Sequence, residues 1–151
     1  MRTKIATIKS FFSAPAIAVV GATDNQRKFG NAIYRGMKER KLNIYPVNPG
    51  RASVQGDKCY SSLQDLPEKV KSVVVVIPPS ATEKLVAQCV EHGVEVLWMQ
   101  SGSESPIAIQ EAKASGITVI SKECVLMFLE PVTSAHGFHR WINKAVGIYP
   151  N

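Results

Sequence analysis

Residues 16–31 read AIAVVGATDNQRKFGN and contain the parts of a strand–turn–helix unit. The first five residues form an apolar run that ends at Gly21, which is typical of a buried strand. Apolar residues at helical spacing predict a helix over residues 31–41. A glycine turn that leads into a helix N-terminus presents free backbone N–H groups and the positive end of the helix dipole. The stretch therefore predicts an anion site as well as a fold unit.

The same alternation of strand and helix continues along the chain. Short apolar runs predict strands at residues 16–20, 44–47, 73–77, 94–99 and 117–120, with a short extended piece near 58–60. Helices are expected at residues 4–12, 31–41, 80–92 and 106–115, followed by a C-terminal helical segment over about 122–146. Ser80 and Glu83 have capping-box spacing, and Ser105 with Pro106 is expected to begin the next helix.

The run from Val73 to Ile77 indicates the fold class. Its five β-branched residues in a row suggest burial on both faces, as in a parallel sheet. Short connections between strands and helices then predict an α/β, Rossmann-like, doubly wound fold. We expect a mainly parallel five-stranded sheet with helices on both faces, formed as one domain over residues 1–151. Ligands of such sheets bind beyond the carboxyl ends of the strands.

Composition and charge narrow the class of protein. Hydrophobic residues make up 45% of the chain and charged residues 20%, which excludes a disordered chain. The formal net charge of +6 permits a polyanionic partner, but no basic–aromatic motif favours nucleic acid. The excess of basic over acidic residues is confined to the segment 27–51, where Glu39 is the only acidic residue. Its basic residues are Arg27, Lys28, Arg35, Lys38, Arg40, Lys41 and Arg51.

The cysteines, Cys59, Cys89 and Cys124, are odd in number and widely spaced. Neither a disulfide framework nor a zinc ribbon is expected, and reduced thiols in a cytoplasmic protein are the simple interpretation. No apolar run approaches the roughly 18 residues that span a bilayer, so no membrane segment is expected.

The histidines offer no catalytic or metal-binding pattern. His136 and His139 are three residues apart, but no cysteine or acidic cluster accompanies them, so no metal is expected. His92 precedes Gly93 and is expected to be a cation at a helix C-terminus. No residue is assigned a catalytic role.

Two common nucleotide sites are disfavoured by the turn itself. The dinucleotide fingerprint requires glycine where this chain has Gly21, Thr23 and Gln26, and only the first position fits. The second strand ends at Asn48 and Pro49 without the carboxylate that would hold an NAD ribose. A Walker motif is absent because Asn31 follows Gly30.

Five short motifs at successive strand ends carry a family resemblance. They are Val19-Val20-Gly21-Ala22-Thr23, Lys28-Phe29-Gly30-Asn31, Val47-Asn48-Pro49, Ile77-Pro78-Pro79 and Gln100-Ser101-Gly102. In order and spacing they resemble the stand-alone, Rossmann-like CoA-binding domain family. The domain is similar to that of the succinyl-CoA synthetase alpha subunit and of ADP-forming acyl-CoA synthetases. The resemblance covers roughly residues 5–145.

The resemblance implies a coenzyme A site at the carboxyl edge of the sheet. Residues 21–23 and 28–31 would hold the pyrophosphate and the 3′-phosphate, residues 47–49 and 77–79 would flank the adenosine, and residues 100–102 would lie along the pantetheine arm. Thr23 stands where the family commonly has serine, and Arg27 has no assigned role. The implied site residues are Gly21, Ala22, Thr23, Arg27, Lys28, Phe29, Gly30, Asn31, Val47, Asn48, Pro49, Ile77, Pro78, Pro79, Gln100 and Gly102.

The resulting functional hypothesis is a protein that binds CoA or an acyl-CoA. Two alternatives stay open: a subunit that supplies CoA to a synthetase-type partner enzyme, and a regulator that binds NAD or another nucleotide. Cys59 or Cys124 could form a mixed disulfide with the CoA thiol. A homodimer through the C-terminal segment with Phe128, Phe138 and Trp141 is a further hypothesis.

Overall fold

The computed structural model describes residues 3–129. The chain forms α1 (Ile5–Phe12), β1 (Ile17–Val20), α2 (Phe29–Glu39) and β2 (Ile44–Val47) in its first third. A short hairpin, β3 (Ser53–Val54) with β4 (Asp57–Lys58), and the 3-10 turn η1 (Leu63–Asp65) come next. The chain continues through β5 (Ser72–Val75), α3 (Pro79–His92), β6 (Val96–Gln100), α4 (Pro106–Ala114), β7 (Thr118–Glu123) and the 3-10 turn η2 (Val125–Met127).

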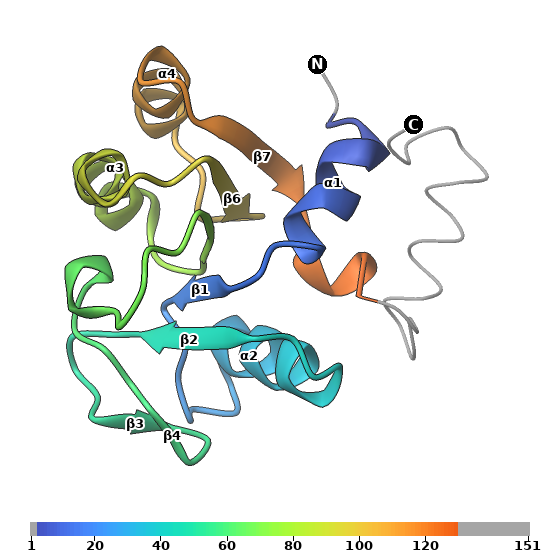
Figure 1. Cartoon of the computed structure of the whole chain (residues 1–151), viewed down its shortest axis with the longest axis vertical. Coiled ribbons are helices and arrows are strands. Elements are labelled where there is room, and N and C mark those ends of the chain that lie inside the picture. Colours follow the sequence, from blue (N-terminus) through green and yellow to red (C-terminus); the bar gives the residue numbers. More distant parts are fainter. Residues whose placement is uncertain (1–2, 130–151) are drawn as a thin grey trace.

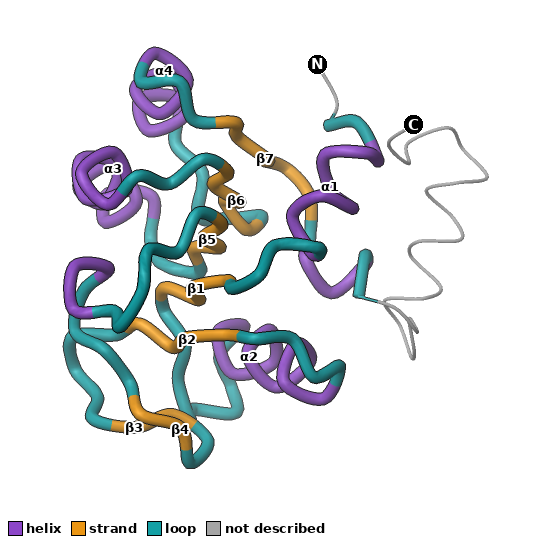
Figure 2. Tube along the Cα trace, viewed as in Figure 1, coloured by secondary structure: helices purple, strands orange, loops and turns teal. Residues whose placement is uncertain are grey.

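The main sheet has five strands in the order β2-β1-β5-β6-β7, and every neighbouring pair is parallel. Figures 1 and 2 show the twisted sheet with the β3–β4 hairpin set apart beside β2. The strand β2 lies on one side of β1, and the later strands β5, β6 and β7 extend from the other side. The switch in strand order therefore lies between β1 and β5. Pro46 is accommodated because β2 is an edge strand. The predicted α/β, Rossmann-like, parallel fold is confirmed.

Helices cover both faces of the sheet (Figure 1). Alternate side chains of β1, such as Ala18 and Val20, pack in one core cluster with α3 and α4. Their neighbours Ile17 and Val19 pack in a second cluster with α1, α2 and the residues around η2. The continuous apolar runs of the strands therefore serve two cores, which is why the sequence shows no polar alternation there.

Several predicted boundaries are wrong. Ser80 does not cap α3, because the helix begins at Pro79 and no capping-box hydrogen bond forms at its N-terminus within the described residues. Ser105 does cap α4, since its hydroxyl accepts a hydrogen bond from the Ala108 N–H at 3.0 Å. Residues 122 and 123 continue strand β7 instead of starting a helix.

The predicted C-terminal helical segment is only partly visible in the described chain. Its first part is the short 3-10 turn η2, and Trp98 contacts the residues on both sides of this turn. The Trp98 Nε1–H donates to the Glu123 carbonyl oxygen at 3.1 Å, and its ring lies 5.8 Å from that of Phe128. The remainder of the segment, with Phe138 and Trp141, lies outside the described residues.

No helix among residues 3–129 is long and apolar enough to cross a membrane.

His92 differs from its expected role as a cation. Its side chain is buried, and its Nε2 atom accepts a hydrogen bond from the Val70 N–H at 3.0 Å. An imidazole that accepts through Nε2 is neutral and carries its proton on Nδ1. Burial, with a smaller contribution from the positive charge of Lys69, lowers the pKa of His92. The residue ties the C-terminus of α3 to the segment that leads into β5.

Candidate ligand-binding groove at the carboxyl edge

Two adjoining hollows lie at the carboxyl ends of β1, β5 and β6, and we call them together the edge groove. They share Gly21, Lys28, Val76, Ile77 and Pro78. The β6 half, about 360 Å³, is completed by Arg27, Phe29, Gly30, Gln100, Ser101, Gly102 and Ser103. The β2 half, about 370 Å³, is completed by Thr23, Asn48, Gly50 and Arg51. The groove lies where strand order reverses, the expected position for a ligand of a doubly wound sheet.

Gly21 forms the floor of the groove through its backbone. Its φ of +95° is in the left-handed region, and a Cβ atom there would lie 2.3 Å from the carbonyl oxygen of Val76. The Gly21 N–H donates to the Val47 carbonyl oxygen at 2.9 Å. Only glycine lets the chain turn here between β2 and β5 and enter the loop toward α2.

The loop from residue 23 to residue 31 is held by its own side chains. The Asn31 amide donates to the Thr23 carbonyl oxygen at 3.0 Å, and the Thr23 hydroxyl oxygen accepts from the Asn25 N–H at 3.2 Å. The Asn25 side-chain oxygen accepts from the Arg27 N–H at 3.0 Å. These bonds fix the approach to α2.

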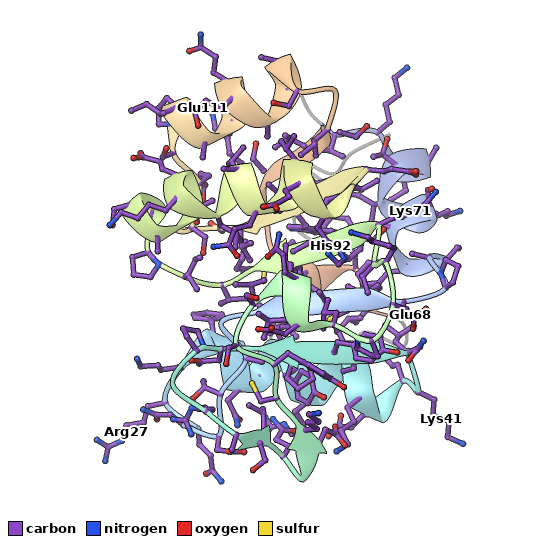
Figure 3. The ribbon with its side chains drawn as sticks, turned by 60° about the vertical axis from the view of Figure 1, so that its left-hand side comes forward. Arg27, Lys41, Glu68, Lys71, His92 and Glu111 are labelled. Atoms are coloured by element: carbon purple, nitrogen blue, oxygen red, sulfur yellow. The ribbon has the colours of Figure 1, made fainter. Side chains whose placement is uncertain are left out.

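The start of α2 faces the groove as a donor-rich helix end. The helix begins at Phe29, and within the described residues the side chain of the N-cap residue, Lys28, makes no capping hydrogen bond. The first backbone N–H groups of a helix lack intrahelical partners and carry a partial positive charge. Lys28 itself lines both halves of the groove, and the exposed Arg27 extends outward from the same loop in Figure 3. The arrangement suits a negatively charged group.

Asn48 braces the turn after β2 against the turn after β1. Its Nδ2 donates to the Ala22 carbonyl oxygen at 3.0 Å, and its Oδ1 accepts from the Gly50 N–H at 3.0 Å. Arg51 follows and lines the β2 half, and its guanidinium lies 3.6 Å from the Asp24 carboxylate. Asp24 also accepts from the Gln55 N–H at 2.7 Å. The β2 half is thus basic, with one acid partly balancing Arg51.

The β6 half is walled by the ends of β5 and β6. The Ile77 N–H donates to the buried Ser103 hydroxyl oxygen at 3.1 Å, which joins the two strand ends. The Gly102 N–H donates to the Glu104 carboxylate at 2.6 Å and closes the turn after β6. Val76, Ile77 and Pro78 give this half, and the β2 half that shares them, an apolar wall.

The Gln100 side chain makes hydrogen bonds within the fold. Its Oε1 accepts from the Val125 N–H at 3.0 Å, and its Nε2 donates to the Cys124 sulfur at 3.2 Å. Both bonds tie the end of β6 to η2. The side-chain amide of Gln100 is therefore already hydrogen-bonded, and Gln100 contributes its backbone to the groove.

The structure brings most of the expected site residues together and leaves some aside. Those that line the groove are Gly21, Thr23, Arg27, Lys28, Phe29, Gly30, Asn48, Ile77, Pro78, Gln100 and Gly102. Those that do not line it are Ala22, Asn31, Val47, Pro49 and Pro79. Ala22 and Val47 are core residues, the Asn31 side chain is buried against Thr23, and Pro79 is the first residue of α3.

Val76, Arg51 and Ser103 also line the groove, although the sequence did not identify them as site residues. Arg51 had a signal, because it ends the basic segment just after the Asn48 turn. Ser103 had none, because its bond to Ile77 joins residues that are 26 positions apart.

None of the three thiols of the described chain is among the residues that line the groove, although the sulfurs of Cys59 and Cys124 contact the lining residues Asn48 and Gln100. Cys59 and Cys89 are buried, and burial raises the pKa of both thiols. Cys124 is half-buried against Gln100. Residues 3–129 contain no group of three or more His, Cys, Asp or Glu side chains that could hold a metal ion.

Comparison with known proteins decides the family. A family model described as a CoA binding domain matches residues 15–130. The chain belongs to this CoA-binding domain family. The matched range includes all five strands of the main sheet and both halves of the edge groove.

Relatives of this CoA-binding domain include the alpha subunit of an ADP-forming acetate–CoA ligase II from Pyrococcus furiosus. The two are 29% identical over 126 residues, which is 76% of this chain but 28% of the ligase subunit. The chain thus spans little more than a quarter of that relative's length.

Solved structures agree with the fold. A conserved hypothetical protein from Pyrococcus furiosus is 34% identical with a TM-score of 0.70, covering 73% of this chain and 95% of that one. The apo form of a dinucleotide-forming acetyl-coenzyme A synthetase 1 from Candidatus Korarchaeum cryptofilum is 27% identical with a TM-score of 0.68. That match covers 80% of this chain and 28% of the synthetase. The domain is therefore homologous to part of ADP-forming acyl-CoA synthetases.

Proposed function

We propose that the chain binds coenzyme A or an acyl-CoA in the edge groove. The observation that carries the proposal is the position of the α2 N-terminus and Lys28 at a groove that combines basic side chains with the apolar wall of Val76, Ile77 and Pro78. CoA combines the same two properties, because it has phosphates and an uncharged pantetheine arm. The proposal assigns no catalytic residue.

The phosphates are assigned to the basic part of the groove. Backbone N–H groups of the first α2 turn and the Lys28 ammonium would bind the pyrophosphate. Arg51 lines the β2 half and is placed to bind a further phosphate there. A phosphate monoester carries about −1.5 to −2 charges at neutral pH, so several cations and a helix end suit a ligand with three phosphates.

Calorimetric titration of the purified chain tests the proposal. We expect saturable binding of CoA, weaker binding of 3′-dephospho-CoA and still weaker binding of NAD. Strong NAD binding with no CoA binding would support a nucleotide regulator and overturn the proposal.

A second candidate function is favoured by the similarity to a ligase subunit. In this role the chain supplies CoA to a synthetase-type partner enzyme. Affinity purification of the tagged chain from its own cells, with and without added CoA, tests this role. Enrichment of a protein with synthetase-type domains supports it, and a chain that purifies alone argues for independent CoA binding. The homodimer and the cytoplasmic location stay predictions.

A further inference from the structure

Phe29 is an exposed aromatic residue at the mouth of the edge groove. It is the first residue of α2, its relative exposure is 59%, and it lines the β6 half. Only two other large hydrophobic residues are comparably exposed in the described chain, Val90 and Ile107, and neither lines the groove.

The position of Phe29 on its helix explains why it is uncovered. Phe29, Ile33 and Met37 follow one another at four-residue spacing and form one apolar stripe of α2. Ile33 and Met37 are fully buried against the sheet. Phe29 continues the stripe one turn further, beyond the carboxyl ends of the strands, where no strand remains to cover it. The stripe therefore ends over the groove.

The side chains across the β6 half are also apolar. Val76, Ile77 and Pro78 line the same hollow as Phe29, and the Ile77 backbone is fixed by its bond to Ser103. The cations of the described groove come from other positions: Arg27 and Lys28 line this half from the loop before α2, and Arg51 lines the β2 half. A ligand whose phosphates lie near Lys28 would extend its uncharged part between Phe29 and the β5 end.

We infer that the Phe29 ring covers the pantetheine arm of CoA and makes the groove prefer CoA over the nucleotide part alone. This inference rests on the proposed function. CoA and adenosine 3′,5′-bisphosphate share the 3′-phosphate and the first 5′-phosphate and differ in the second phosphate of the pyrophosphate and in the pantetheine arm. An apolar cover over the arm contributes only to CoA, and truncation of Phe29 removes none of the phosphate contacts. The Phe29 side chain thereby acts as a specificity-determining group, while its backbone N–H belongs to the helix end.

Titration of CoA and of adenosine 3′,5′-bisphosphate into the wild-type chain, Phe29→Ala and Phe29→Leu tests the inference. We expect Phe29→Ala to weaken CoA binding about tenfold, as loss of a covered ring predicts, and to leave the bisphosphate affinity unchanged. Phe29→Leu should retain most of the CoA affinity because it restores apolar cover. Val90→Ala, a truncation of an exposed residue outside the groove, should change neither affinity.

The outcomes separate the inference from the proposed function. Equal weakening of both ligands would place the ring against the adenine, and unchanged CoA affinity would remove it from the site; either result overturns the inference while CoA binding stands. A wild-type chain that does not bind CoA would overturn both. Because Phe29 is exposed, its variants should melt at the wild-type temperature, which confirms that each affinity belongs to a folded protein.

Discussion

Gly30, in the first turn of α2, lies directly against the carbonyl oxygen of Gly21. A Cβ atom at position 30 would lie 2.1 Å from that oxygen and 3.4 Å from the Thr23 methyl group. The first distance is far shorter than any real contact of a Cβ atom, so the helix start and the glycine turn can meet only if position 30 is glycine. This contact sets where the α2 N–H groups stand relative to the groove floor.

Gly30→Ala is therefore expected to push α2 away from the turn. The free energy of unfolding should fall by about 1–3 kcal/mol, as for overpacking at other tight contacts. CoA affinity should fall as well, because the helix end moves. Chemical denaturation and calorimetry measure the two effects. Gly50→Ala is the stability control, since its Cβ would meet the Asn48 side-chain oxygen at an ordinary 3.5 Å. A Gly30→Ala protein as stable as the wild type would contradict the close contact.

Asp24→Asn should strengthen CoA binding. The Asp24 carboxylate lies 3.6 Å from the Arg51 guanidinium and adds a negative charge beside the β2 half. Asparagine keeps the side-chain oxygen that accepts from the Gln55 N–H, so the loop should stay in place. We expect about threefold tighter binding at low salt and a smaller gain as salt screens the charges. Glu111→Gln removes an acid on α4, outside the groove, and should leave affinity unchanged. Weaker binding by Asp24→Asn would count against phosphate binding near Arg51.

Lys28→Gln should have the opposite effect. Lys28 lines both halves of the groove at the N-terminus of α2, so its ammonium can reach a phosphate in either position. Loss of a charge-assisted hydrogen bond should weaken CoA binding about tenfold and reduce its salt dependence. Lys113→Gln, on α4, serves as the matched charge control. If the two variants bind CoA equally well, the α2 loop is not the phosphate site.

His92 makes stability depend on pH in a defined direction. Burial and Lys69 lower its pKa in the folded chain, and the unfolded chain keeps the ordinary value of about 6.5. Below that pH the unfolded state binds a proton that the folded state resists, so the free energy of unfolding falls as pH falls through about 6.5. His92→Gln removes this titration. Between pH 8 and pH 5 the melting temperature of the wild type should fall more steeply than that of His92→Gln. Parallel dependence of the two melting temperatures on pH would contradict a lowered pKa of His92.

The parallel sheet could be predicted from residues 73–77 because burial on two faces leaves a recognisable apolar run. The ends of the helices were harder to predict from the sequence. Ser105 was predicted as a cap because it acts through residues adjacent in sequence, whereas the capping box at Ser80 failed because Pro79 starts that helix earlier. The strand β7 extends into the segment predicted as helical because its partner β6 continues to Gln100.

The site could be predicted where its residues directly follow strands. Gly21, Lys28 and Pro78 line the groove for that reason. Side-chain direction could not be predicted, because it depends on distant partners. Gln100 turns away to Cys124 and Val125, although its position along the chain suggested a role toward the ligand.

Titration of CoA into the ¹⁵N-labelled chain, followed through backbone amide signals, tests the central claim most directly. The account predicts saturable shifts at Gly21, Gly30 and Gly102, which line the groove, with little change at Gly93 and Gly116, which follow α3 and α4 at the opposite edge. Shifts centred on Gly93 and Gly116, or no shifts at saturating CoA, would contradict it.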